Sequence, residues 1–163
     1  MLKRVFLAAV LLALVAAASE ARPAVATTAG PRVGFSLDPD QLVVGGHLQV
    51  GEIAPSLTFD PSLELGFGDD VTVIAMNFDM HYHVELQESD WRPYFGAGIG
   101  VNFTDSDRRA PQRDQTDTEV GGSVVLGASV PIRSGNRFFG EMRLGLGGGI
   151  AELKLIAGWN FRI

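Results

Sequence analysis

Two histidines, His81 and His83, stand two positions apart, with Asp79 before them and Glu85 after them. Residues two apart in a β-strand point to the same side, so both imidazoles could reach one metal ion. The same side chains could instead hydrogen-bond one another on the inner wall of a barrel. Short motifs of this kind frequently occur without a function. We favour the second interpretation, in which the histidines are hydrogen-bonded on an inner wall, and we predict neither a metal site nor a cofactor.

Residue types that occur in catalytic sites are present, but the sequence motifs that usually surround them are not. Ser123 and Ser129 could be combined with His81 and Glu141 as nucleophile, base and orienting acid. The G-x-S-x-G turn that exposes a hydrolase serine does not occur in the sequence. The glycine run at 96–100, GAGIG, lacks the strand-to-helix context of a phosphate loop. We therefore expect no enzyme and no catalytic residues.

The elements that would carry these residues are strands. The chain has 20 glycines, 8 prolines and 10 phenylalanines, a composition that suits strands and turns. Apolar and polar residues alternate with period two, which is the signal of a strand with two different faces. The long alternating stretches are residues 41–53, 56–68, 70–86, 91–104, 118–132, 137–148 and 151–163.

All of these stretches exceed the ~10 residues that soluble strands rarely surpass, and a tilted strand needs ~9–11 residues to cross a bilayer. One face carries large apolar side chains, and the other mixes glycines with charges of both signs. In a small closed barrel such charges can pair across the lumen while the apolar face meets lipid. We predict a lumen charge network of Glu64, Asp79, His81, His83, Glu85, Arg92, Glu119, Glu141, Arg143, Lys154 and Arg162. The predicted lipid-facing or girdle residues are Phe59, Phe67, Trp91, Phe95, Phe103, Trp159 and Phe161.

The N-terminus has the three parts of an export signal. Lys3 and Arg4 precede an apolar run that is too short for a membrane helix, and small residues follow at Ser19 and Ala21. We predict a signal peptide at 1–21, a flexible lead-in at 22–30 and a barrel domain at 31–163. Cleavage after Ala26 is the alternative. The chain has no cysteine, so neither a lipid anchor on cysteine nor a disulfide is available.

Bacterial single-chain barrels have an even number of strands, so the seven long stretches require an eighth. The remaining place is 32–37, followed by a turn at Asp38-Pro39-Asp40; the strand either begins earlier, near Ala29, or contains an irregularity. Val71 and Val73 break the alternation of 70–86, which suggests a bulge or a parity switch near Ile74. The polar segment 105–117 should be a long outer loop, and 87–90 and 133–136 should be short inner turns.

The export signal, the alternating strands, the Gly-rich charged face and the terminal pattern L-x-L-x-A-x-W-x-F-x-I resemble small bacterial outer-membrane β-barrels of the OmpA/OmpX/OmpW-like superfamily. The resemblance covers Arg32 to Ile163. It implies an all-β, eight-stranded antiparallel up-and-down transmembrane barrel in the outer membrane. It also implies contact with lipids and lipopolysaccharide, and recognition of the last strand by the barrel assembly machinery. Family members usually end in an aromatic residue, whereas this chain ends in Ile163.

The formal net charge of −6 argues against a nucleic-acid partner. We expect a monomeric, porin-like barrel of the outer membrane that has a structural or interaction role. One alternative is a narrow pore or a carrier for small hydrophobic molecules. The other is a soluble periplasmic lipocalin-like barrel, which would need an apolar lumen and a polar exterior. Arg108, Arg109 and Arg113 in the outer loop could contact lipopolysaccharide, although the neighbouring aspartates favour a solvated loop.

Overall fold

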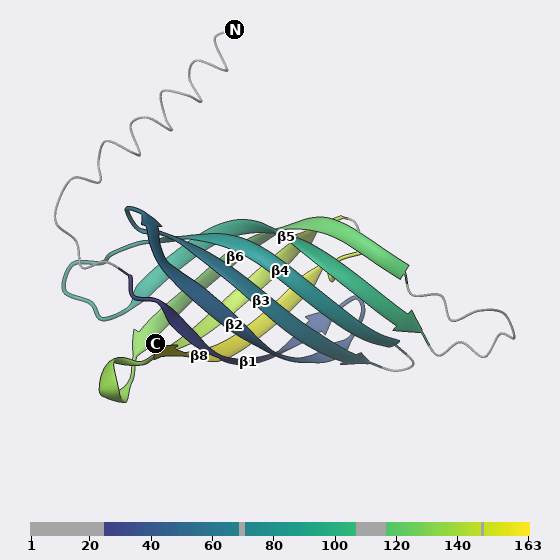
Figure 1. Ribbon diagram of the computed structural model, residues 1–163, viewed down its shortest axis with the longest axis horizontal. Coiled ribbons are helices and arrows are strands. Elements are labelled where there is room, and N and C mark those ends of the chain that lie inside the picture. Colours follow the sequence, from purple (N-terminus) through teal and green to yellow (C-terminus); the bar gives the residue numbers. More distant parts are fainter. Residues whose placement is uncertain (1–24, 69–70, 107–116, 148) are drawn as a thin grey trace, which may run out of the picture.

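The computed structural model describes residues 25–68, 71–106, 117–147 and 149–163. Eight antiparallel strands form a closed barrel in which each strand pairs with the next and the last pairs with the first (Figure 1). The predicted eight-stranded up-and-down barrel is therefore confirmed, and the proposed signal peptide at 1–21 lies outside the described residues. The strands are β1 (Thr28–Leu37), β2 (Gln41–Ala54), β3 (Leu57–Gly68), β4 (Val71–His83), β5 (Arg92–Ser106), β6 (Asp117–Pro131), β7 (Arg137–Leu146) and β8 (Leu153–Arg162).

The first strand begins earlier than the main prediction of 32–37 and agrees with the alternative start near Ala29. Thr28 pairs with Gln49 of β2 on one side and with Arg162 of β8 on the other. Residues 28–30 thus belong to the barrel rather than to the lead-in predicted at 22–30. The Thr-Ala-Gly-Pro stretch at 28–31 shows no apolar–polar alternation, so its sequence does not predict a strand. Its place in the barrel is fixed by pairing with β2 and β8, which are distant in the sequence.

The bulge or parity switch predicted near Ile74 is wrong. The register of β3 and β4 is continuous from Leu57 opposite Tyr82 to Gly68 opposite Val71. Val73 points into the lumen and is buried, so it breaks the polar pattern of that face without breaking the ladder. The irregularity lies instead in the pairing of β2 with β3, between Val50 and Ala54. β4 also ends at His83, short of the predicted 86.

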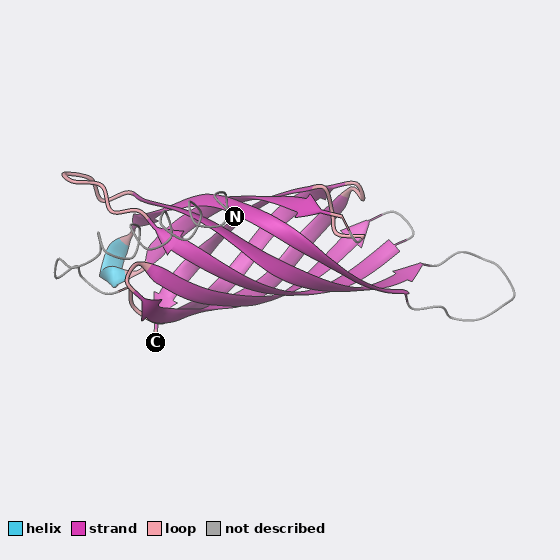
Figure 2. Cartoon of the chain, turned by 90° about the horizontal axis from the view of Figure 1, so that it is seen from above, coloured by secondary structure: helices cyan, strands magenta, loops and turns pink. Residues whose placement is uncertain are grey.

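The connections divide between the two ends of the barrel. The turn expected at Asp38-Pro39-Asp40 joins β1 to β2, and a short 3-10 helix at Arg133–Gly135 joins β6 to β7. β1 begins and β8 ends at the same end of the barrel, which also holds the short helix (Figures 1 and 2). Most of the predicted outer loop, including its three arginines, lies outside the described residues. No helix in the described part of the chain is long and apolar enough to span a membrane.

Burial is reversed relative to a water-soluble barrel. Among the described residues, the buried side chains include more polar and charged groups than apolar ones, while large apolar side chains cover the outside. Phe67, Trp91, Phe95, Trp159 and Phe161 are exposed, and Phe59 and Phe103 are half-buried on the same outer face. The soluble lipocalin-like alternative required the opposite facing, so this arrangement contradicts it.

The facing can be tested with arginine on the outer surface. Leu126 faces outward in the middle of β6, where Phe95 and Met142 flank it. We expect Leu126→Arg to lower the free energy of unfolding in lipid vesicles by ~2–4 kcal/mol, because it places a charge at the level of the acyl chains. Equilibrium unfolding in urea, followed by tryptophan fluorescence, measures the change.

Val120→Arg is the matched control, because Val120 faces outward on the same strand but close to its end. Its expected cost is only about 0–1 kcal/mol, since arginine near the interface remains hydrated. Equal costs for the two variants would contradict the proposed position of the bilayer.

Candidate functional site: a charge network across the lumen

Arg143 occupies the centre of the lumen and is completely buried. Its guanidinium donates two hydrogen bonds to Asp79, from Nη1 to Oδ1 at 3.1 Å and from Nη2 to Oδ2 at 2.5 Å. Nη2 also lies 3.5 Å from Oε1 of Glu141, and Nη1 lies 3.4 Å from the hydroxyl of Ser123. This fork geometry is the strongest form of arginine–carboxylate pairing.

The network continues through a second arginine. Arg32 Nη2 lies 2.5 Å from Oε1 of Glu141, and its Nε lies 3.2 Å from Oε1 of Glu64. Lys154 Nζ donates to Oε2 of Glu64 at 3.0 Å, and the Tyr94 hydroxyl donates to Oε2 of Glu141 at 3.1 Å. Cations and carboxylates therefore alternate without a gap, in the order Lys154, Glu64, Arg32, Glu141, Arg143 and Asp79.

These six ion-paired residues come from β1, β3, β4, β7 and β8, so the network joins opposite walls of the barrel. Glycines leave room for it. A Cβ at Gly98 would collide with the Asp79 carboxylate, and a Cβ at Gly127 would collide with the ring of Tyr94. The glycines on the inner face therefore accommodate long side chains that cross from the neighbouring strand.

Such a network fills and closes the lumen, but it adds little net stability by itself. Removing charges from water costs several kcal/mol per ion, and the attraction between well-placed partners offsets this cost only in part. Deleting one partner is different, because it leaves the opposite charge buried without compensation. The network therefore fixes which residues face each other across the barrel.

A second polar cluster lies nearer the end that holds the termini. Oδ2 of Asp60 is 2.5 Å from the Thr58 hydroxyl and 3.5 Å from Nδ1 of His81, and Oδ1 accepts a hydrogen bond from Gln49 at 3.0 Å. Nε2 of His83 lies 3.0 Å from the Thr58 hydroxyl. The Thr58 hydroxyl has one proton, and the Asp60 carboxylate accepts it.

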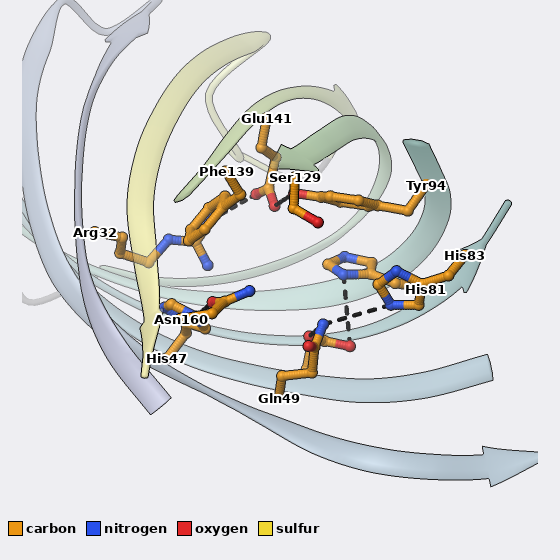
Figure 3. A pocket seen from close by; sticks show the side chains of 11 residues that line it. Arg32, His47, Gln49, His81, His83, Tyr94, Ser129, Phe139, Glu141 and Asn160 are labelled. Atoms are coloured by element: carbon orange, nitrogen blue, oxygen red, sulfur yellow. Dashed lines mark hydrogen bonds and ion pairs between the residues drawn. The ribbon is translucent and has the colours of Figure 1, made fainter. Parts of the chain in front are cut away.

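The two clusters share one small cavity of about 20 Å³, whose labelled side chains converge in Figure 3. A cavity of this size holds about one water molecule. Three imidazoles line it, and each has one buried ring nitrogen without a hydrogen-bond partner among the described residues. These atoms are Nδ1 of His47, Nε2 of His81 and Nδ1 of His83. On His47 the other ring nitrogen lies 2.5 Å from Oδ1 of Asn160.

The metal and hydrolase patterns considered from the sequence are not assembled here. Among the residues that the structure describes, no group of three or more His, Asp or Glu could hold a metal ion. The Ser129 hydroxyl accepts a hydrogen bond from Arg137 Nε at 2.9 Å, and Ser123 contacts Arg143. In the described part of the chain neither serine is hydrogen-bonded to His81.

The structure brings together most of the predicted lumen residues and leaves four apart. Buried in the lumen are Glu64, Asp79, His81, His83, Glu141, Arg143 and Lys154. Glu85 and Arg162 are exposed, which corrects their predicted inward position. Glu85 lies two residues beyond the end of β4 and Arg162 is the last residue of β8, so the barrel wall does not enclose either side chain. Arg92 and Glu119 are half-buried near strand ends and have no ion-pair partner among the described residues.

Sequence reasoning missed Arg32, Asp60 and Tyr94 as members of the interior clusters. Their signal was strand parity. Asp60 shares the face of Glu64, and Tyr94 is opposed to the outward Phe95. Arg32 precedes the outward Val33 in the strand whose start was uncertain. Alternation alone could thus have placed all three inside.

The network predicts non-additive effects on stability. Arg143→Met should destabilise the folded barrel by about 3–5 kcal/mol, because Asp79 is then buried without its cation. Adding Asp79→Asn should recover a large part of this loss, since the uncompensated charge is removed. Urea unfolding in vesicles measures both variants. Arg133→Met, at an exposed position, is the control and should stay within ~0.5 kcal/mol. Additive costs for Arg143 and Asp79 would refute the coupling.

Comparison with known proteins is consistent with this architecture. No family model matches the chain, and no curated protein matches it by sequence. The N-terminal β-barrel domain of Pseudomonas aeruginosa OprF is similar, with a TM-score of 0.64 and 15% identity, over 85% of this chain and all of that one. Neisserial surface protein A has a TM-score of 0.60 and 16% identity, over 86% of this chain and 96% of that one. A de novo designed transmembrane β-barrel has a TM-score of 0.57 and 17% identity, over 88% of this chain and 99% of the designed one. The chain therefore has the fold of the small outer-membrane β-barrels.

Proposed function

We propose that this protein is an outer-membrane β-barrel with a structural or interaction role and no catalytic activity. The observation that carries the proposal is the reversed burial, with apolar side chains outside and an ion-paired network inside. Water would make this arrangement unfavourable, because many large apolar side chains on the outer face of the strands would be exposed to it. In a bilayer it is the favourable one, since acyl chains cover the apolar face and the backbone is bonded within a closed ladder.

Strand dimensions and aromatic residues support the membrane setting. The strands are 10 to 15 residues long, against the ~9–11 that a tilted crossing requires. Trp159 and Phe161 point outward near the end of β8, and Trp91 is exposed just before β5, at the same end of the barrel. Aromatic side chains of this kind favour the boundary between acyl chains and headgroups. Their position supports an assignment of this end to one of the two membrane interfaces.

The partners that we propose follow from this location. The outer surface contacts membrane lipids, and the loop end contacts lipopolysaccharide. The barrel assembly machinery recognises β8, whose outward residues Leu155, Trp159 and Phe161 present an apolar edge before closure. A monomer is the state that we propose for the folded barrel, and it is supported by the pairing of β1 with β8, which leaves no strand edge for a second copy.

The ion-paired centre favours a closed scaffold over the alternative of a pore or carrier. The small cavity near the termini and a larger cavity at the opposite mouth lie on either side of the network. An ion that crossed the lumen would have to separate Arg143 from Asp79 or Arg32 from its glutamates. These contacts are buried and short, so we expect steady conduction to be absent.

Membrane insertion can be tested directly. The full chain expressed in a Gram-negative host should remain in the outer-membrane fraction after carbonate washing and require detergent for release. A folded barrel should also migrate differently on a gel before and after heating, because the closed ladder resists the detergent until it is unfolded. Recovery in the soluble periplasmic fraction, with no change of migration on heating, would overturn the proposal.

Conductance distinguishes the scaffold from a pore. We expect the wild-type barrel to give no steady conductance in planar bilayers. The double variant Arg143→Ser/Asp79→Ser should give measurable conductance, because it removes the central bidentate pair and leaves space for water. Arg133→Ser/Glu85→Ser, which changes exposed charges near the termini, serves as the control. Steady conductance of the wild type would favour the pore.

A further inference from the structure

The mouth of the barrel opposite the termini contains a cavity of about 830 Å³. Its wall is formed by the turn after β1, the adjacent ends of β4, β5 and β6, and the connection between β7 and β8. Concave sites of ~300–1,000 Å³ are the usual size for small-molecule ligands. The charge network closes its inner end through Lys154, which lines the cavity and donates to Glu64.

Gln41 supplies an unmet hydrogen-bond donor in this cavity. Its side chain lies against Gly66 and Gly68 of β3 and is 4% exposed. The amide nitrogen Nε2 is buried and has no hydrogen-bond partner among the described residues. Leaving a buried polar group unpaired is unfavourable, so a ligand with an acceptor oxygen would gain from reaching it.

One side of the cavity is apolar and held in place. Ile150 and Ala151 are 8% and 4% exposed, and Val73 contributes from β4. The connection that carries the first two is tied to the barrel by hydrogen bonds from Asn102 Nδ2 to the carbonyl of Gly149, at 3.1 Å, and from the amide of Gly145 to the carbonyl of Glu152, at 3.0 Å. This wall could pack against a short aliphatic or aromatic group.

The rim is acidic. Asp38, Glu119 and Glu152 line the opening, and no cation among the described residues lies within ion-pair distance of them. Lys154 is deeper and already paired with Glu64. Clefts lined by one sign of charge concentrate ligands of the opposite sign.

We propose that this mouth cavity binds a small organic ammonium ion that carries an apolar group and a carbonyl or hydroxyl oxygen. The ammonium group lies at the rim beside Glu119, the apolar group packs against Ile150, and the oxygen accepts a hydrogen bond from Gln41. This arrangement uses the acidic rim, the apolar wall and the unpaired amide together. It goes beyond the scaffold role, and it does not depend on which membrane holds the barrel.

Leucinamide is a suitable probe, because it combines an ammonium group, an isobutyl group and a carboxamide oxygen. Isoamylamine lacks the acceptor, and 4-methylpentanamide lacks the ammonium group. Each would be titrated into the isotopically labelled full barrel in detergent micelles, and amide chemical shifts would be followed. We expect leucinamide to give saturable shifts at the Gln41 side-chain amide and at Val73. Each of the two partial analogues should bind at least about threefold more weakly.

Two variants test the assigned contacts. Glu119→Gln should weaken leucinamide about three- to tenfold by removing one rim charge, whereas Glu85→Gln, at the opposite end, should leave the affinity unchanged. Gln41→Leu should abolish the preference for leucinamide over isoamylamine. An unchanged spectrum away from the mouth shows that each variant is folded.

Three results would overturn the proposal. The first is a set of leucinamide-induced shifts that do not saturate, and the second is equal affinity for leucinamide and 4-methylpentanamide. The third is a saturable shift of the Gln41 and Val73 resonances with magnesium chloride, together with no shift on addition of leucinamide. Membrane location is measured separately by carbonate extraction. Failure of leucinamide binding in a barrel that remains in the membrane would therefore reject this site without rejecting the scaffold.

Discussion

The pairing of β1 with β8 is the contact on which the rest of the structure depends. It removes the last free strand edge, so the backbone groups along the barrel wall are bonded between neighbouring strands. Closure also separates two environments, because successive side chains of a strand alternate between the outside and the lumen. A ring of eight strands encloses a space that side chains can just fill. The outside must then suit whatever surrounds the barrel, and the inside must fill itself.

The ionic filling of the lumen follows from that geometry. Long cationic side chains can cross a narrow interior that glycines keep open, and carboxylates on other strands meet them there. Arg32 of β1 and Arg143 of β7 both reach Glu141, and Arg32 also reaches Glu64 of β3. These partners are distant in the sequence, so the network can form only once closure has brought the strands together. The correct register of the strands and the charge neutrality of the lumen are therefore coupled.

Period-two alternation predicted seven of the eight strands, the facing and most of the buried charges, and the even strand number of such barrels supplied the eighth. It worked because the two faces of each strand lie in strongly different environments. It failed where the environment changes along the strand. Val73 is apolar yet points inward near the mouth, and this was misread as a bulge or a parity switch. Glu85 and Arg162 continue the inward parity but lie beyond the enclosed part of the barrel. The start of β1 and the partners of Arg32 depend on register, which no local pattern contains.

The central network also lets the two ends of the lumen differ. Near the termini, His81, His83 and Asp60 form a compact hydrogen-bonded cluster around a cavity of about 20 Å³. At the mouth, apolar residues and acidic side chains line a cavity of about 830 Å³. If the middle were open, water and ions would pass between these regions and both would experience one common solvent. Because paired charges occupy the middle, the composition of the mouth can vary without opening a path through the barrel. A sealed centre is thus the condition under which a mouth can carry a binding site of its own.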